Sequence, residues 1–357
     1  MPVPQEKIQV GILGATGVVG QRFIQLLESH PWFEVAWLAA SERSSGQRYG
    51  DAVRWKLPTP LPARVAEITV ASAMPNEWKA APPRMIFAAL DSKIAAELEP
   101  AYVAAGLIVI SNSSALRMHP DVPLLIPEVN AEHLALIEQQ ASRTLNGAYA
   151  VTNPNCSATG LAMALAPLHR AFRVEQVFVA TMQAVSGAGY PGVASLDILG
   201  NVVPHIGGEE EKLETETQKM LGTFSNGEIA HAPIKVSAHC NRVPVEDGHT
   251  ESVSIKLKQA ATREQIIDAW REFGGEPQEL QLPSAPVRPL LYVDEVDRPQ
   301  PRLDVNAERG MATVIGRLRP CNLFDWKFTL LSHNTVRGAA GAAILNAELL
   351  KAKGLLA

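Results

Sequence analysis

The sequence predicts an α/β protein with two domains: a doubly wound parallel sheet, followed by an α+β domain with a mixed or antiparallel sheet. The length of 357 residues favours two domains, because a typical domain has roughly 100–200 residues. The first 150 residues alternate short apolar strands with helix-length segments, and from about Val174 the chain changes to β-branched runs. Apolar residues make up 46% of the chain and charged residues 19%, which is enough apolar material for substantial cores.

The first domain is expected to consist of parallel strands joined by helical crossovers, as parallel neighbours require. A long Ala/Leu-rich helix after His333 is expected to return to this domain. The predicted boundaries are therefore residues 1–152 plus 334–357 for the first domain and 153–333 for the second. The expected strands are Ile8–Leu13, Glu34–Ala39, Met85–Ala89 and Leu107–Ile110, and the expected helices are Val18–Glu28 and Lys93–Ala105.

The second domain is expected to have helices on one face of its sheet. The short segment Glu246–Gly248 lies between the second and third strands and predicts an antiparallel hairpin. Thr262 and Gln265 have the capping-box pattern at the start of the last helix. Six prolines make residues 274–310 mostly loop. The expected strands are Val174–Val185, Lys235–Val245, Glu251–Lys258, Leu291–Val296, Thr313–Arg319 and Trp326–Leu331, and the expected helices are Ala158–Ala171, Glu209–Leu221 and Arg263–Phe273.

Charge and cysteine content exclude several classes of protein. There are 32 Lys and Arg against 37 Asp and Glu, so the chain lacks the basic excess of a nucleic-acid-binding protein. The three cysteines, Cys156, Cys240 and Cys321, form no CxxC pair and indicate neither a disulfide framework nor a zinc site. The N-terminus has no signal-peptide pattern, and apolar stretches such as 101–110 are too short to span a bilayer. We therefore expect a cytoplasmic protein without bound metal and without a membrane partner.

A glycine-rich turn follows the first strand. Gly14, Gly17 and Gly20 have the spacing GxxGxxG instead of the GxGxxG of the usual dinucleotide fingerprint. Such a turn lets backbone N–H groups approach a diphosphate, and the helix N-terminus adds partial positive charge. The same turn can also join a strand to a helix without any ligand. Its position at the first βα junction favours a Rossmann-type nucleotide site.

The segment after the second strand is where such a site reads the ribose 2′ position. An acidic residue there favours NAD and an arginine favours NADP. Both Glu42 and Arg43 occur, so charge alone does not decide between the two cofactors. Arg43 with Ser41 and Ser44 has the composition of a 2′-phosphate pocket, and equally that of an ordinary polar loop.

Cys156 lies near the expected start of a helix, in the string NPNCSATG. Backbone amides at a helix N-terminus lower a thiol pKa from about 8.5 and can also hold an oxyanion, so this is a setting for a nucleophile. A single cysteine in this place is also a common small buried residue.

His239, His249 and Arg242 lie around the expected hairpin. An imidazole can deprotonate a thiol, and an arginine fork suits a carboxylate or phosphate. The same residues are equally typical of a polar surface loop.

Eight sequence blocks, in order, resemble the aspartate-semialdehyde dehydrogenase family, in the branch typical of archaea and fungi. They cover nearly the entire chain, and eight collinear blocks are far more specific than any one motif. The blocks are GATGVVGQRF at 14–23, SNSSALRM at 111–118, VPLLIPEVN at 122–130, NPNCSATGL at 153–161, QAVSGAGYPG at 183–192, GGEEEKLETE at 207–216, SAHCNRVPVEDGHTE at 237–251 and LSHNTVRGAAGAAILNAELL at 331–350.

The resemblance implies NADPH-dependent reductive dephosphorylation of L-aspartyl-4-phosphate to aspartate 4-semialdehyde, the branch-point step toward lysine, threonine and methionine. On this interpretation Cys156 attacks the acyl phosphate, phosphate leaves, and the thioester accepts a hydride. A thioester is a better hydride acceptor than a carboxylate, and thiolate is a good leaving group. The resemblance also implies a homodimer or homotetramer.

The family motifs imply a role for each matching residue. Cys156 takes the nucleophile position, His249 the general acid/base position and Gln183 the position that orients the intermediate. The implied substrate residues are Arg242 for the carboxylate, Glu209 for the amino group, Lys212 and Arg117 for phosphate, and Asn112 near Arg117. The implied NADP(H) residues are Gly14, Thr16, Gly17, Val18 and Val19 in the diphosphate turn, Ser41, Arg43 and Ser44 at the 2′-phosphate, Ser186 and Gly187 near the nicotinamide, and Asn334 in the returning C-terminal segment.

Two alternatives stay open at this point. Malonyl-CoA reductase resembles the same branch, and its substrate is already a thioester. A catalytically silent nucleotide-binding relative would keep the fold alone. Three consecutive glutamates, 209–211, leave the register of the substrate contacts open, and structural roles are assigned to His239 and Asn130.

Overall fold

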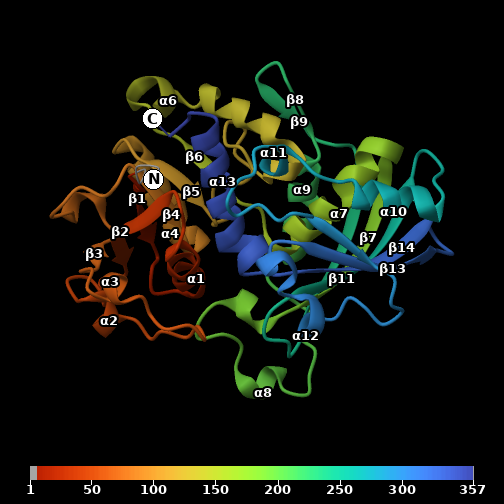
Figure 1. Ribbon diagram of the computed structural model, residues 1–357, viewed down its shortest axis with the longest axis horizontal. Helices are drawn as coiled ribbons and strands as arrows, with labels where there is room; N and C mark the ends of the chain where they lie inside the picture. Colours follow the sequence, from red (N-terminus) through yellow and green to blue (C-terminus); the bar gives the residue numbers. More distant parts are fainter. Residues whose placement is uncertain (1–5, 357) are drawn as a thin grey trace, which may run out of the picture.

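The computed structural model describes residues 6–356 and contains two six-stranded sheets that lie side by side (Figure 1). The first sheet has the order β3-β2-β1-β4-β5-β6, and every neighbouring pair is parallel. This is the strand order of a Rossmann dinucleotide-binding sheet, so the predicted doubly wound fold is confirmed. Its strands are β1 (Ile8–Leu13), β2 (Phe33–Ala40), β3 (Ala71–Ser72), β4 (Met85–Ala88), β5 (Ile108–Ser111) and β6 (Ala150–Thr152).

Helices cover both faces of this sheet. Helix α1 (Val18–Leu27) and the C-terminal helix α13 (Gly341–Ala352) share one apolar core with the inward side chains of β1 and β2. Helix α4 (Ser92–Ala104) packs Leu98 and Tyr102 into a second core on the opposite face. Because both faces of the sheet are covered by helices, side chains on either side of each strand are buried. This explains why the strands are nearly continuous apolar runs in the sequence.

The second sheet is mixed, with the order β10-β7-β11-β14-β13-β12. The predicted hairpin across Glu246–Gly248 is wrong: β7 lies between β10 and β11, parallel to the first and antiparallel to the second. The segment therefore crosses the end of β7 and does not close a two-stranded turn. The strands are β7 (Val174–Gln183), β10 (Lys235–Arg242), β11 (His249–Leu257), β12 (Leu290–Val293), β13 (Thr313–Pro320) and β14 (Trp326–Ser332).

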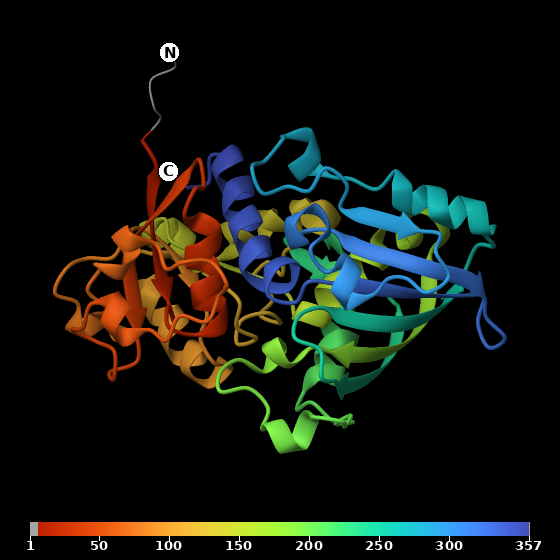
Figure 2. The ribbon, with the colours of Figure 1, turned by 60° about the horizontal axis from the view of Figure 1, so that its bottom comes forward.

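Three helices cover one face of the second sheet: α7 (Cys156–Phe172), α9 (Glu209–Met220) and α10 (Arg263–Arg271). The capping box predicted at Thr262 and Gln265 is present at the start of α10. On the opposite face, alternate side chains of β7 such as Phe178 and Met182 are exposed. The segment around α8 (Ser195–Ile198) projects from the molecule near these strands (Figure 2).

The remaining elements are short. The two-stranded ribbon is β8 (Thr223–Ser225) with β9 (Glu228–Ala230). The short helices are α2 (Tyr49–Ala52), α3 (Ala63–Ala66), α5 (Pro127–Asn130), α6 (Ala141–Asn146), α11 (Glu276–Glu279) and α12 (Pro301–Asp304), with 3₁₀ segments at Pro75–Glu77, Ala131–Gln139, Val185–Ala188 and Ala307–Gly310.

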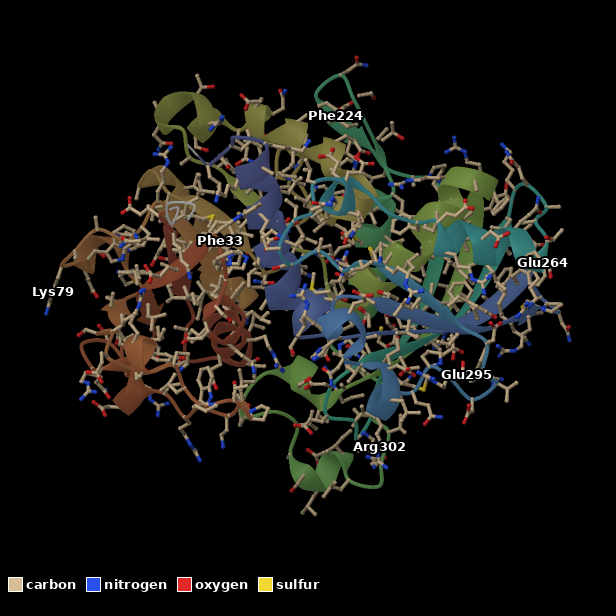
Figure 3. All side chains as sticks on the ribbon, in the orientation of Figure 1. Phe33, Lys79, Phe224, Glu264, Glu295 and Arg302 are labelled. Atoms are coloured by element: carbon tan, nitrogen blue, oxygen red, sulfur yellow. The ribbon has the colours of Figure 1, made fainter. Side chains whose placement is uncertain are left out.

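The two sheets belong to lobes at opposite ends of the molecule, marked by the exposed Lys79 and Glu264 in Figure 3. A π-helical turn, Val336–Ala340, leads into α13 and contacts both α1 of the first lobe and α7 of the second. Helix α1 and the start of α7 are thus joined through one short segment. Within residues 6–356, no helix is long and apolar enough to cross a membrane.

Candidate active site

A thiol and an imidazole meet where α7 begins. Cys156 is the first residue of α7, and its Sγ lies 3.2 Å from Nε2 of His249, the first residue of β11. The two residues are 93 positions apart in sequence, so only the packing of α7 on the sheet brings them together. His249 is buried, and Cys156 as a whole residue keeps partial exposure.

Burial keeps both groups neutral in the free protein. It raises the pKa of Cys156 to about 12, an effect that the Glu209 carboxylate reinforces and that Arg117, Arg242 and the Ser157 N–H oppose. Burial, together with Arg242, lowers the pKa of His249 to about 3. The lowered thiol pKa expected from the helix start is therefore wrong for the free protein, because desolvation of a thiolate outweighs the helix amides.

One backbone hydrogen bond determines which nitrogen of His249 carries the proton. The Ala184 N–H donates to Nδ1 at 3.0 Å. Nδ1 must therefore be unprotonated, and the proton of the neutral imidazole lies on Nε2, facing the sulfur. In this state His249 is a hydrogen-bond donor to Cys156 or to an oxygen placed beside it.

Asn155 caps α7 and joins it to α9. Its Oδ1 accepts hydrogen bonds from the backbone N–H groups of Ser157 and Ala158, at 2.9 and 3.1 Å. Its Nδ2 donates to Glu209 at 2.8 Å. The cap orients the first turn of α7 and so fixes the sulfur against the imidazole.

The residues expected to contact substrate surround this pair. Glu209 accepts a hydrogen bond from Lys212 at 2.8 Å, and Gln183 Nε2 lies 3.4 Å from the same carboxylate. Although burial raises it, the pKa of Glu209 is held below its usual value by Lys212 and by the hydrogen bonds from Lys212 and Asn155. Arg242 is buried, with Nη1 donating to a backbone carbonyl at 2.7 Å, and burial lowers its pKa.

Arg117 and Asn112 are linked by hydrogen bonds to the turn before Cys156. Arg117 Nη2 donates to the Asn112 carbonyl at 2.7 Å, and Nη1 donates to Glu216 of α9 at 2.9 Å. The Asn112 side chain accepts from Asn153 at 2.9 Å. The structure therefore brings together all eight residues expected for catalysis and substrate binding: Cys156, His249, Gln183, Arg242, Arg117, Glu209, Lys212 and Asn112.

Gly338 supports Cys156 from the π-helical turn. A Cβ at this position would lie 2.7 Å from the Cys156 Cβ and 2.9 Å from its Cα. Real side chains do not approach so closely, so only glycine lets the turn pack against the nucleophile's backbone. On the far side, Gly187 lies against Arg242 and His249, where a Cβ would come within 2.9 Å of Arg242 Nη1.

The glycine turn after β1 fits a dinucleotide phosphate. Gly14 has a positive φ of 85°, and a Cβ there would meet the Ala89 carbonyl oxygen at 2.3 Å. Gly17 is the N-cap of α1 and provides no side-chain cap, so the first N–H groups of this helix keep their capacity for a phosphate. Thr16, Val18 and Val19 belong to the same turn and helix start and are half-buried.

The other residues expected for the cofactor lie just after β2, β7 and β14. Ser41 and Arg43 are exposed and Ser44 is half-buried, directly after β2 at the carboxyl edge of the sheet, where open α/β sheets bind ligands. Asn334 Nδ2 donates to Ser186 Oγ at 2.8 Å, and its Oδ1 accepts from the Gly248 N–H at 2.8 Å. Asn334 thus fixes the loop that precedes His249.

Three residues of the site escape sequence analysis: Asn155, Glu216 and Gly338. Asn155 directly precedes the cysteine, and asparagine is a preferred N-cap residue, so its capping role could have been predicted from the sequence. Glu216 reads as one more charge in an acidic helix, and Gly338 reads as one more small residue in an Ala/Gly-rich helix. Neither has a local signal, because each role depends on a partner more than 60 residues away. The structure gives Asn130 and His133 a shared buried hydrogen bond of 3.0 Å, and places His239 on the exposed face of β10 beside Phe178.

Comparison with known families defines the class of the protein as a semialdehyde dehydrogenase. The model of the NAD-binding domain of these enzymes matches residues 9–137, and the model of their dimerisation domain matches residues 165–337. The two matches together cover well over half of the chain.

Relatives of the same length narrow the class. An aspartate-semialdehyde dehydrogenase of Methanothermobacter thermautotrophicus is 50% identical over 96% of this chain and 99% of the relative. One from Schizosaccharomyces pombe is 46% identical over 98% and 99%. A crystal structure of the Candida albicans enzyme with NADP has 41% identity and a TM-score of 0.89, covering 97% of this chain and 99% of that one. The chain belongs to the aspartate-semialdehyde dehydrogenase family, as the eight sequence blocks indicated.

Proposed function

We propose that the protein catalyses the NADP-dependent interconversion of L-aspartyl-4-phosphate and aspartate 4-semialdehyde plus phosphate, with Cys156 as the nucleophile. One observation carries the proposal: a thiol at a helix N-terminus, 3.2 Å from an imidazole and surrounded by cationic side chains. The names of the full-length relatives support this substrate over malonyl-CoA. The presence of the complete polar set around the thiol argues against a silent nucleotide-binding relative.

In the acyl-transfer step the chain supplies the nucleophile and the charge. The Cys156 Sγ–C bond forms as the bond between the acyl carbon and the phosphate oxygen breaks. The thiol proton leaves with inorganic phosphate, so a neutral thiol gives a neutral thioester. The His249 Nε2–H and the Ser157 N–H donate toward the negative charge that develops on oxygen or sulfur.

The substrate's charged groups are matched by the surrounding residues. Arg242 takes the α-carboxylate, Glu209 the amino group, and Lys212 and Arg117 the phosphate. Gln183 orients the acyl group above the thiol. Buried charges of both signs around one thiol make the site specific for a substrate that carries an amino group and two anionic groups.

In the reductive step the chain holds the cofactor and releases the product. The residues that would hold NADP(H) are Gly14, Thr16, Gly17, Val18 and Val19 for the diphosphate, Arg43 with Ser41 and Ser44 for the 2′-phosphate, Ser186 and Gly187 near the nicotinamide, and Asn334 from the returning C-terminal segment. When bound, NADPH supplies the hydride that reduces the thioester carbon. The C–S bond then breaks, and Sγ leaves as a thiolate that the His249 Nε2–H stabilises before it takes up a proton.

The proposal also assigns a role to each domain and an oligomeric state to the protein. Residues 1–152 with 334–357 bind the cofactor, and residues 153–333 supply the nucleophile and the dimer contact. The exposed sheet face with Phe178 and Met182 supports a homodimer through this face, or a homotetramer made of two such dimers. Because Cys156 must remain a thiol, the proposal places the enzyme in a reducing compartment, the cytoplasm.

Oxidation of aspartate semialdehyde by NADP in the presence of phosphate tests this function. We expect the wild-type protein to form NADPH beyond one equivalent per site only when phosphate or arsenate is added. Purified, folded protein that forms no NADPH under these conditions would contradict the proposal. NADPH formation that requires coenzyme A and malonate semialdehyde would favour the malonyl-CoA reductase alternative.

A further inference from the structure

Glu216 is a buried carboxylate that the reaction scheme leaves without a role. It lies on α9, and each of its oxygens accepts one short hydrogen bond. Arg117 Nη1 donates to Oε1 at 2.9 Å, and the backbone N–H of Asn155 donates to Oε2 at 2.6 Å. One carboxylate therefore joins the expected phosphate-binding arginine to the residue that precedes the nucleophile.

The same helix also holds the backbone of Arg117. Lys219, one turn after Glu216, is buried and donates to the carbonyl oxygens of Arg117, His119 and Val122 at 2.7, 2.8 and 2.9 Å. Glu209, Lys212, Glu216 and Lys219 are spaced by three or four residues and so share one face of α9. This face fixes both ends of the Arg117 residue, its backbone and its guanidinium.

The hydrogen bonds of Arg117 leave donors for an anion. Nη1 contacts Glu216 and Nη2 contacts the Asn112 carbonyl, so two hydrogen bonds fix the plane of the guanidinium. Nε is buried and has no hydrogen-bond partner within residues 6–356. A buried N–H without a partner costs free energy, and an oxyanion beside the guanidinium would remove that cost.

We propose that Glu216 is a positioning residue that orients Arg117 toward the phosphate group of the substrate and couples it to the turn before Cys156. This inference rests on the proposed function. Glu216 does not touch the substrate. It accepts from a cation and from a backbone amide at the same time, which only a carboxylate can do with both oxygens, because an amide side chain has one acceptor and one donor.

Protection of Cys156 from iodoacetamide by inorganic phosphate tests the proposal without turnover. Because a neutral thiol reacts slowly, alkylation of the Cys156 peptide is followed by mass spectrometry over long incubations at mildly alkaline pH, in the presence of NADP and increasing phosphate. In the Glu216→Gln variant, we expect the half-protective phosphate concentration to rise at least about tenfold, the usual scale for losing a hydrogen bond to a charged group. Glu216→Asp keeps both acceptor oxygens, so its half-protective phosphate concentration should lie between those of Glu216→Gln and the wild type.

Three controls separate a positioning role from a general structural role. Glu214→Gln changes a carboxylate on the same helix that accepts from the Ala238 N–H at 3.1 Å, and it should leave phosphate protection unchanged. The KM for NADP and for the semialdehyde should change less than the KM for phosphate in Glu216→Gln. In an Arg117→Ala background, Glu216→Gln should have no further effect on phosphate protection, because a residue that acts through Arg117 has nothing left to orient.

The outcomes distinguish a failure of the role inferred for Glu216 from a failure of the proposed function. Wild-type protein that oxidises the semialdehyde with phosphate, together with unchanged protection in Glu216→Gln, would overturn this inference and leave the proposed function standing. Additive effects of the two substitutions would also overturn it. Absence of phosphate protection and of phosphate-dependent turnover in the wild type would overturn both.

Discussion

At the scale of single residues, burial keeps the reacting thiol and its neighbouring imidazole neutral. Cys156 begins as a thiol and His249 as an imidazole with its proton on Nε2. The pair therefore does not resemble a resting thiolate–imidazolium pair. The proton must leave the sulfur during the attack itself, when the charge of the phosphorylated substrate and the donors around it compensate for desolvation.

Cys156→Ala should abolish turnover and keep cofactor binding. No other side chain of the site is a comparable nucleophile, so we expect kcat to fall by more than about 10³-fold. The dissociation constant of NADPH should stay within a few-fold of the wild-type value, because the glycine turn lies in the other lobe. Steady-state rates and fluorescence titration of NADPH measure the two quantities, and loss of NADPH binding would mean that Cys156 has a structural role.

His249→Asn should lower kcat by about 10²–10³-fold, the usual loss when one hydrogen-bond donor to the developing charge is removed. The asparagine can still accept from the Ala184 N–H, so the loop before it should keep its position. We therefore expect a smaller effect on the KM for NADP than on kcat. A variant with an unchanged kcat would remove the imidazole from the mechanism.

Glu251 should make the stability of the protein depend on pH. It lies two residues after His249, is fully buried, and has no hydrogen-bond partner for either oxygen within residues 6–356. Burial raises its pKa well above the ordinary value. The folded protein thus keeps this proton above about pH 4.3, where the unfolded chain releases it, and the stability falls as the pH rises by up to about 1.4 kcal/mol per pH unit.

Glu251→Gln should remove this dependence, because the amide is neutral in both states. Compared with the wild type, the variant should gain free energy of unfolding as the pH is raised from about 4.3 toward neutral. Urea unfolding at several pH values measures the difference, and the exposed Glu228→Gln serves as the matched control. Parallel curves for the wild type and Glu251→Gln would contradict a neutral buried acid.

At the scale of elements, the helix start at α7 depends on its neighbours as much as on its own sequence. The Asn155 cap, the α9 carboxylates and the π-helical turn all hold it from outside. The sequence predicted the existence and type of nearly every long element, because apolar periodicity and capping residues are local signals. It missed the insertion of β7 between β10 and β11, because that pairing joins segments about 60 residues apart.

Gly338→Ala should lower activity without a large loss of cofactor binding. The added Cβ would lie 2.7 Å from the Cys156 Cβ, so either the turn or the nucleophile must move. A displacement of about 1 Å at a reacting group costs on the order of 10²-fold in rate, and we expect kcat to fall by about that factor. Gly274→Ala, which meets only the end of a glutamine side chain at 3.9 Å, is the matched control. Equal rates for the two variants would contradict the support that Gly338 gives to Cys156.

At the scale of the whole molecule, the site exists only where the two lobes meet. Helix α1, which follows the glycine turn, contacts the turn Val336–Ala340, and that turn contacts Cys156. A second link is an ion pair between Arg22 of α1 and Asp247, which lies just before His249. Nη2 of Arg22 is 3.7 Å from Oδ2 of Asp247. The sequence could name these residues from family motifs, but only the folded chain shows which of them share one site.

Detection of the acyl-enzyme tests the central claim most directly. The protein is mixed with aspartate semialdehyde and NADP without phosphate, and the intact mass and its peptides are measured before and after phosphate is added. The account predicts a thioester on Cys156 that forms only with NADP and disappears on addition of phosphate. Turnover without an acyl group on Cys156, or with the acyl group on another residue, would contradict it.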